Sequence, residues 1–318
     1  MPEVIEAIAA DALSAGVLSA DGVPATGRSA WSETLGDYLT LTKPRIMSLL
    51  VLTALCSMIA AAGGSPATLP LVGLVIGGAL ACGGASALNH VLDRDIDRLM
   101  GPRTASRPVA AGRITPRRAV AFGLGLSALS FVVMTLLDNV LAAALALSGG
   151  AFYVVVYTLW LKRSTTQNIV IGGAAGAIPP LAGWAAAYGH LGLGAGLLFL
   201  IVLLWTPPHF WALALLLSPH YEAARVPMLT VVRGASATAA QVIAYSLVLV
   251  AVSLLTAALG TFGVLYLASA VVLGGAFCAL AWRLWREQTA PRAAALFHYS
   301  LLYLALLFVA VAADAAIR

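Results

Sequence analysis

Long apolar stretches separated by short polar joints follow one another over most of the chain. Each stretch is close to the roughly 20 residues that an α-helix needs to cross a bilayer, and is much longer than a membrane β-strand. Backbone groups inside a membrane must satisfy their own hydrogen bonds, so such stretches form helices. The pattern predicts an all-α, polytopic membrane helical bundle with nine transmembrane helices. The predicted spans are 46–62, 68–88, 119–137, 139–158, 168–187, 193–217, 238–259, 262–281 and 296–313.

The composition fits a membrane protein with one domain. Hydrophobic residues make up 61% of the 318 residues and charged residues only 10%, which excludes an ordinary soluble domain. We expect a flexible cytoplasmic tail over 1–37 and a single transmembrane domain over 38–318. The tail carries several acidic residues and lacks the basic start of a signal peptide, so we expect a bacterial inner membrane as the location. The three cysteines lie in apolar stretches without a CxxC motif and are expected to be packing residues.

The basic residues are distributed unevenly between the two sides of the predicted bundle. If the tail is cytoplasmic, every lysine and arginine except Arg318 falls on the cytoplasmic side. This asymmetry follows the positive-inside rule and predicts a cytoplasmic N-terminus, an outside C-terminus and a functional face on the cytoplasmic side. It also explains the net charge of +5 by contact with the lipid bilayer, without nucleic acid as a partner.

The most highly charged part of the chain, 89–107, directly follows an apolar stretch. Asn89, Asp93 and Asp97 are spaced i, i+4 and i+8, which puts three oxygen-bearing side chains along one face of a helix. Aligned carboxylates repel one another unless a cation joins them, and Mg²⁺ prefers a few carboxylates together with phosphate oxygens of a substrate. We therefore predict Asn89, Asp93 and Asp97 as catalytic metal ligands, with Mg²⁺ as the cofactor and a diphosphate as the substrate.

Several basic side chains near the predicted inner surface are candidates for binding that diphosphate. Arginine offers a planar fork that matches phosphate oxygens. After the fourth predicted span, a new helix begins and points its free N–H groups towards any bound anion. The predicted diphosphate-binding residues are Lys43, Arg45, Arg103, Arg107, Lys162 and Arg163. Three other arginines, Arg113, Arg117 and Arg118, are expected to set topology or to contact lipid headgroups.

The motif W-T-P-P-H-F-W at 205–211 lies within a predicted span. Its two prolines predict a kinked or broken helix, which is tolerated where a helix lines a cavity. A histidine inside a membrane is a functional candidate, so His209 is expected to ligate a haem iron, to exchange a proton or to hold the kink. Phe210 and Trp211 either line the same cavity or form an aromatic belt at the membrane interface.

Five motifs, in the same order along the chain, resemble the UbiA superfamily of intramembrane prenyltransferases. The most similar branch is that of the protohaem IX farnesyltransferases, because the second and third motifs below are typical of it. The resemblance covers about 38–235. The branch is indicated by K-R-S-T-T-Q-N (162–168) and T-P-P-H-F-W (206–211), which are the second and third motifs. The first motif is N-x-x-x-D-x-x-x-D (89–97), and the other two are L-T-K-P-R (41–45), which precedes it in the chain, and V-P-M-L (226–229), which comes last.

The resemblance implies transfer of the farnesyl group of farnesyl diphosphate to a vinyl group of haem B, with addition of water, to give haem O and diphosphate. Asn89, Asp93 and Asp97 would hold Mg²⁺, and the basic residues would stabilise the charge on the leaving diphosphate. Tyr221, in the loop before V-P-M-L, is a candidate for the haem cavity beside His209. A downstream haem A synthase is an expected partner.

One position departs from the family pattern. Members usually have an aspartate before the tyrosine in the loop ahead of V-P-M-L, whereas this chain has His220 before Tyr221. Glu222 follows and is an alternative source of the carboxylate, and therefore a candidate metal ligand. If Glu222 does not take that role, the site would hold one Mg²⁺ rather than two.

Two other functions stay open from the residues alone. A UbiA-type prenyltransferase that acts on an aromatic quinone precursor would have the same diphosphate site. A cation-coupled membrane transporter would use the acidic residues to bind its ion. Such a site is expected near the bilayer midplane, whereas 89–97 lies at the predicted inner edge.

Overall fold

The computed structural model describes residues 30–318. The chain divides into two units, Met1–Gly36 and Asp37–Arg318, and the description here concerns the second. Most of the predicted tail, 1–37, lies outside the described residues, so its boundary stays a prediction. In the described part of the chain every regular element is a helix, in agreement with the predicted all-α fold.

The helices are long where the sequence is apolar and short where it is polar. The long elements are α3 (Pro44–Ala61), α4 (Thr68–Leu92), α7 (Pro116–Leu137), α8 (Val140–Ala151), η1 (Phe152–Leu161), α10 (Asn168–Tyr188), α11 (Leu193–Leu216), α13 (Leu229–Ala258), α14 (Val264–Glu287) and α15 (Ala290–Ile317). The short elements are α5 (Arg94–Leu99), α6 (Pro102–Ala105), α9 (Lys162–Ser164) and α12 (Ser218–Ala223), and α2 (Ala30–Thr42) precedes α3.

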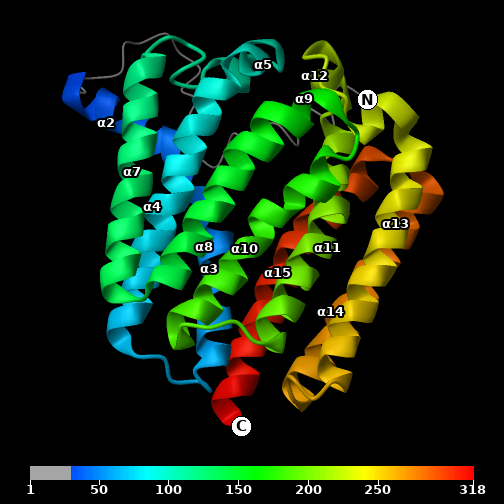
Figure 1. Cartoon of the computed structure of the whole chain (residues 1–318). Coiled ribbons are helices and arrows are strands. Elements are labelled where there is room, and N and C mark those ends of the chain that lie inside the picture. Colours follow the sequence, from blue (N-terminus) through cyan, green and yellow to red (C-terminus); the bar gives the residue numbers. More distant parts are fainter. Residues whose placement is uncertain (1–29) are drawn as a thin grey trace. The chain divides into compact units, whose positions relative to one another are not determined.

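The long helices run side by side, and the short helices α5, α9 and α12 gather at the end of the bundle opposite the C-terminus (Figure 1). α4 packs against α7, and α11 packs against α10, α13 and α15. The last helix, α15, packs against α3, the first of the long helices, so the row of helices closes on itself. The polar joints with the sequence motifs therefore share one end of the bundle.

The predicted spans agree with the helices. Eight described helices are long and apolar enough to cross a membrane, and the bent pair of residues 31–42 and 47–61 would make a ninth. Several helices extend beyond the predicted span: α13 begins at Leu229 rather than at 238, and α15 begins at Ala290 rather than at 296. The added turns are more polar, because apolar periodicity marks only the part of a helix that lies in lipid.

Small residues allow the central helices to approach closely. A Cβ atom on Gly183 of α10 would lie 1.9 Å from the backbone oxygen of Ala54 on α3, so only glycine fits at this crossing. Close backbone approach at small residues is the usual packing mode of membrane helices, since lipid supplies no hydrophobic drive for association. This crossing fixes α10 against α3 below the polar end of the bundle.

Two local features differ from the expectations. A kinked or broken helix was predicted at Pro207 and Pro208; α11 continues as one helix through both prolines, so the break is absent. The fourth span changes from α-helix to π-helix over Phe152–Leu161, which the sequence pattern did not indicate. π-helical turns inside membrane or core helices occur frequently at functional sites.

Candidate functional site

The acidic motif lies across a break between two helices. α4 ends at Leu92, Asp93 takes a non-helical conformation (φ −90°, ψ 4°), and α5 begins at Arg94. The hydrogen-bond spacing nevertheless continues, because Asp93 N donates to Asn89 O (2.9 Å) and Asp97 N donates to Asp93 O (2.7 Å). Asn89, Asp93 and Asp97 are therefore brought together on one face, as the spacing predicts, and each is at most 2% exposed.

Three cations surround this buried face. Lys162 Nζ donates to Asp93 Oδ2 (2.6 Å), and Arg107 Nη1 donates to Asp97 Oδ1 (2.5 Å). Lys43 Nζ donates to Asn89 Oδ1 (2.8 Å). Three of the six predicted diphosphate-binding residues thus converge on the motif from three separate parts of the chain. Buried carboxylates need such counter-charges, because removing an ion from water costs several kcal/mol.

The compensation of the two buried carboxylates is incomplete. Asp93 Oδ1 and Asp97 Oδ2 are buried and have no hydrogen-bond partner among the described residues. Burial raises the pKa of Asp97 above its ordinary value, even though Arg107 opposes that rise. No group of three or more His, Cys, Asp or Glu side chains suited to a metal occurs in residues 30–318, so the two carboxylates would need other ligands, such as the Asn89 amide, water or substrate oxygens, to hold Mg²⁺. Two free carboxylate oxygens beside an amide oxygen fit Mg²⁺, which takes few protein ligands.

The π-helix η1 supplies a residue that the sequence analysis missed. Thr158 is fully buried, and its hydroxyl donates to Tyr153 O five residues earlier (2.9 Å). The same hydroxyl accepts from Asn89 Nδ2 (3.2 Å), whose second interaction is with Asp93 Oδ2 (2.7 Å). Thr158 therefore fixes which way the Asn89 amide points. Thr158 lies four residues before the K-R-S-T-T-Q-N motif, but nothing in the sequence there shows its partner.

The other predicted basic residues lie differently. Arg163 pairs with Asp95 rather than with the Asn89–Asp97 face. The hydrogen bonds from Arg163 hold the pKa of the Asp95 carboxyl well below its usual range. Arg103 is exposed and forms no ion pair with any residue in the described range, and Arg45 is also exposed.

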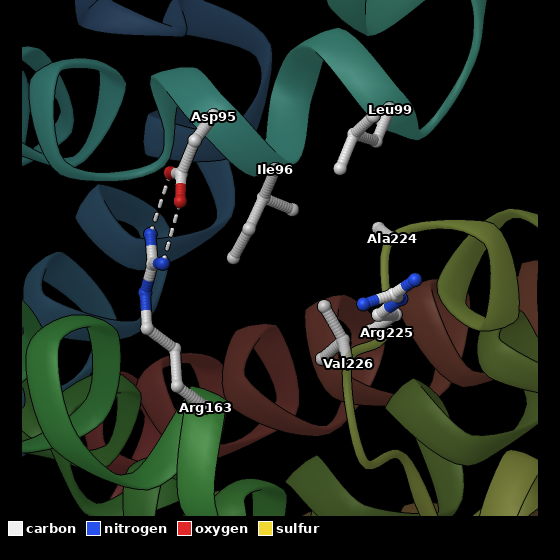
Figure 2. Close-up of a pocket in the computed structure, with 7 residues that line it drawn as sticks. All are labelled: Asp95, Ile96, Leu99, Arg163, Ala224, Arg225 and Val226. Carbon is white, nitrogen blue, oxygen red and sulfur yellow. Dashed lines mark hydrogen bonds and ion pairs between the residues drawn. The ribbon is translucent and has the colours of Figure 1, made fainter.

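The loop after α11 borders the acidic stretch. A side chain on Gly101 would meet His220 Cδ2 at 3.1 Å, so His220 of α12 lies against the turn between α5 and α6. Tyr221 is buried, and burial raises its pKa to about 12, with smaller opposing effects from the nearby charges of Arg107 and Asp93. Glu222 is exposed, and its role as a metal ligand stays a prediction. Residues 224–226 line a cavity of about 140 Å³ together with α5 and Arg163 (Figure 2).

His209 is held in a stack of aromatic rings on α11. Its imidazole lies between Trp205 and Phe297, with ring centroids 4.3 Å and 5.0 Å away and near-parallel planes. His209 Nδ1 lies 2.6 Å from Ser300 Oγ, and this hydroxyl donates its one proton to Phe297 O. His209 Nδ1 must therefore carry the hydrogen, which leaves the lone pair on Nε2.

The two aromatic neighbours of His209 differ in burial. Trp211 is 2% exposed and meets the ring of Tyr245 edge-on, so Trp211 does not belong to an interfacial belt. Phe210 is partly buried against the core. The burial of Trp211 argues against the belt, and its place in a cavity stays a prediction.

A family model described as the UbiA prenyltransferase family matches residues 50–309. The chain belongs to this family. The match confirms the resemblance read from the motifs, and it makes the chain a multi-pass membrane protein of the prenyltransferase class. It also argues against the transporter alternative.

Curated relatives share about half of their residues with this chain. A protohaem IX farnesyltransferase of Symbiobacterium thermophilum is 52% identical over 89% of this chain and 95% of its own length. One from Gloeobacter violaceus is 51% identical over 89% of this chain and 93% of its own length. A third, from Chloroflexus aurantiacus, is 50% identical over 90% of this chain. This chain spans only 48% of that relative's length.

Solved structures share the fold at much lower identity. Digeranylgeranylglyceryl phosphate synthase superposes with a TM-score of 0.74 at 19% identity, over 90% of this chain and 100% of that chain. A UbiA homolog from Archaeoglobus fulgidus, bound to GPP and Mg²⁺, has a TM-score of 0.61 at 16% identity, over 86% of this chain and 99% of that chain. These likenesses confirm the helical architecture and show that a protein of this fold binds a prenyl diphosphate with Mg²⁺.

Proposed function

We propose that the chain transfers the farnesyl group of farnesyl diphosphate to a vinyl group of haem B, with addition of water, to give haem O and diphosphate. The observation that carries the proposal is the buried acidic face, where two carboxylate oxygens lack partners and three cations stand beside them. That combination suits a metal–diphosphate group better than either a bare metal or a bare anion. The names of the relatives that are about 50% identical supply the two substrates.

The acidic face would hold the metal. Asn89, Asp93 and Asp97 offer an amide oxygen and two unpartnered carboxylate oxygens for Mg²⁺. When bound, Mg²⁺ supplies Lewis-acid stabilisation of the diphosphate as the bond to the farnesyl carbon breaks. Glu222 is exposed in the neighbouring loop, and with His220 in the family's aspartate position we propose one Mg²⁺ rather than two.

The three converging cations would bind the diphosphate itself. Lys162 is buried and Lys43 and Arg107 are partly buried. All three are already oriented by hydrogen bonds, so they would stabilise developing negative charge without first reorganising. Arg103 and Arg45 are exposed, and we propose that they contact the diphosphate from the rim of the site. The apolar helices would keep water away from the farnesyl cation, so that water does not attack it before the acceptor does.

His209 would face the acceptor. Its Nδ1–H is held by Ser300, and this is the arrangement that fixes a histidine for iron binding through Nε2. The flanking rings of Trp205 and Phe297 restrict rotation of the imidazole. We propose His209 as the haem ligand. Phe210 and Trp211 follow it directly in α11, and Tyr221 lies in α12, and we propose these three as further residues of the haem site.

We further propose a bacterial inner membrane as the location, with the acidic face on the cytoplasmic side. The uneven distribution of lysine and arginine supports this orientation. Farnesyl diphosphate is charged and water-soluble at its head, so a site at the cytoplasmic edge can receive it. Haem O would then pass to a downstream haem A synthase.

The test is a reaction in membranes that contain the chain. Haem B, farnesyl diphosphate and Mg²⁺ should yield haem O, identified by mass spectrometry, and omission of Mg²⁺ should stop the reaction. If the membranes instead prenylate an aromatic quinone precursor and form no haem O, the acceptor is that precursor rather than haem B, and the proposed diphosphate site is unchanged. Absence of both products, alongside an active relative, would overturn the proposal.

A further inference from the structure

Arg163 forms a clamp across the break in the acidic motif. Its Nη1 and Nη2 donate to the two carboxylate oxygens of Asp95, each at 2.7 Å, and Nη2 also donates to Leu92 O at 2.8 Å. Leu92 is the last residue of α4 and Asp95 lies in the first turn of α5. One guanidinium therefore binds both helices on either side of Asp93, as Figure 2 shows for its pair with Asp95.

The residue before Arg163 makes the contact that matters for the site. Lys162 Nζ donates to Asp93 Oδ2 at 2.6 Å, so two consecutive residues of α9 contact Leu92, Asp93 and Asp95. Asp93 departs from helical geometry between α4 and α5, although the backbone hydrogen bonds from Asp93 N to Asn89 O and from Asp97 N to Asp93 O continue. The clamp adds a side-chain constraint on both sides of this break.

We propose that Asp95 and Arg163 are positioning residues, which hold Asp93 and Lys162 in the geometry that binds the metal and the diphosphate. This inference rests on the proposed function for the metal site, but not on the identity of the acceptor. It replaces the sequence-based expectation that Arg163 binds the diphosphate directly. Both terminal nitrogens of Arg163 already donate to Asp95 and Leu92, whereas the oxygens without a partner among the described residues belong to Asp93 and Asp97.

Another ion pair of the chain provides a matched control. Arg292 and Glu287 form a forked pair at 2.7 Å and 3.0 Å in the joint between α14 and α15. The exposure of the two arginine side chains is the same, at 38%. The control pair contacts no residue of the acidic motif, so its loss tests only the general effect of removing a surface ion pair, which is small.

The experiment measures Mn²⁺ binding to the purified full-length chain in detergent, with inorganic pyrophosphate present, by electron paramagnetic resonance. Mn²⁺ prefers the same oxygen ligands as Mg²⁺. Asp95→Asn and Arg163→Gln should each weaken Mn²⁺ binding by about tenfold or more, the usual effect of removing an outer partner of a metal ligand. The double variant should be no worse than either single variant. Glu287→Gln and Arg292→Gln should bind Mn²⁺ as the unmodified chain does.

Several outcomes would overturn the proposal. If Arg163→Gln weakens binding and Asp95→Asn does not, Arg163 acts on the ligand directly. If the losses multiply in the double variant, the two residues do not act as one unit. If neither variant changes binding, the clamp has no positioning role.

A variant that fails to fold is replaced by a milder one. Arg163→Lys keeps the charge but loses the fork, so it should give an intermediate loss, and an unchanged affinity in a folded Arg163→Lys would contradict the proposal. Mn²⁺ binding does not require haem, so the two proposals can fail separately. If no haem O forms but the Asp95 and Arg163 variants weaken Mn²⁺ binding as described, haem B is not the acceptor and the positioning role of Asp95 and Arg163 still holds.

Discussion

Buried carboxylates occur at both ends of the bundle, and they are satisfied in different ways. Asp314, near the end of α15, is 1% exposed. Its Oδ2 accepts from Gly263 N (2.5 Å) and its Oδ1 accepts from Tyr266 N (3.3 Å) at the start of α14, and Arg318 lies 3.8 Å away. The free N–H groups of a helix N-terminus are a strong partner for an anion, so Asp314 is fully accounted for by the fold.

Asp93 and Asp97 are as deeply buried but keep one oxygen each without a partner. Their partners are side chains, namely the cations Lys162 and Arg107 and the amide of Asn89, rather than backbone N–H groups. A buried oxygen without a hydrogen-bond partner costs about 1–3 kcal/mol of folding free energy. Asp93 and Asp97 carry this cost, whereas Asp314 does not. The comparison teaches that burial alone does not indicate function. Function is indicated instead by buried carboxylates that lack some of their hydrogen-bond partners and lie next to several cationic side chains.

The largest effect is expected from removal of either carboxylate of the acidic face. Asp93→Ala and Asp97→Ala should each lower the rate of haem O formation by at least about 100-fold, because a preorganised electrostatic group is lost. The bundle should stay folded, as judged by helical circular dichroism and by elution as a single species in detergent. Normal turnover in either variant would refute its assignment as a metal ligand.

A second variant tests whether the unpartnered oxygens accept a metal. Lys162→Met leaves Asp93 buried without its cation, which costs about 3–5 kcal/mol of stability in typical cases. Added Mg²⁺ should recover part of the lost melting temperature, because the metal supplies the missing positive charge. A melting temperature of Lys162→Met that does not respond to Mg²⁺, measured beside Asp314→Asn as the control, would count against a metal at this face.

Asp314 should behave as a structural residue. Asp314→Ala removes the acceptor for two backbone N–H groups of α14 and should lower the unfolding free energy by about 1–3 kcal/mol. The rate of haem O formation per folded molecule should not change. A folded Asp314→Ala with a rate as low as that of Asp93→Ala would contradict the distinction between a structural carboxylate at Asp314 and a functional one at Asp93.

The smallest effect concerns Asp138, in the joint between α7 and α8. Both of its carboxylate oxygens are buried without a partner, and burial raises its pKa to about 7. Unlike Asp93, it pairs with no cation in the part of the chain that the structure describes, so burial favours its neutral form. Because its pKa is higher in the folded than in the unfolded chain, its contribution to stability is greatest in acid and falls as the pH rises towards about 7.

Asp138→Asn should remove that pH dependence. The melting temperature of the variant should exceed that of the unmodified chain by more at pH 8 than at pH 5, measured in detergent at both values. An equal difference at the two pH values would show that the carboxyl keeps its ordinary pKa. The rate of haem O formation should be unaffected, since Asp138 lies outside the acidic face.

Periodicity was enough to predict the membrane helices and the common face of Asn89, Asp93 and Asp97. It could not predict the break at Asp93, because the i→i+4 hydrogen bonds continue across it and leave the spacing intact. The π-helix around Thr158 was also missed, since apolar residues follow one another there without a pattern that separates the two helix types.

The partners of the basic residues depend on contacts that no local pattern contains. Lys162 and Asp93 are 69 residues apart, and Lys43 and Asn89 are 46 residues apart. Charge and residue type identified all three cations of the site as candidates. The same criteria also selected Arg163, whose contacts with Asp95 and Leu92 only the folded chain reveals.

The measurement that tests the central claim most directly compares haem extracted from cells that carry the unmodified chain with haem from cells that carry Asp93→Ala at equal abundance. Mass spectrometry should find haem O with the first and only haem B with the second. Haem O in both, or in neither while a relative is active in the same cells, would contradict the claim that the buried acidic face drives farnesyl transfer to haem.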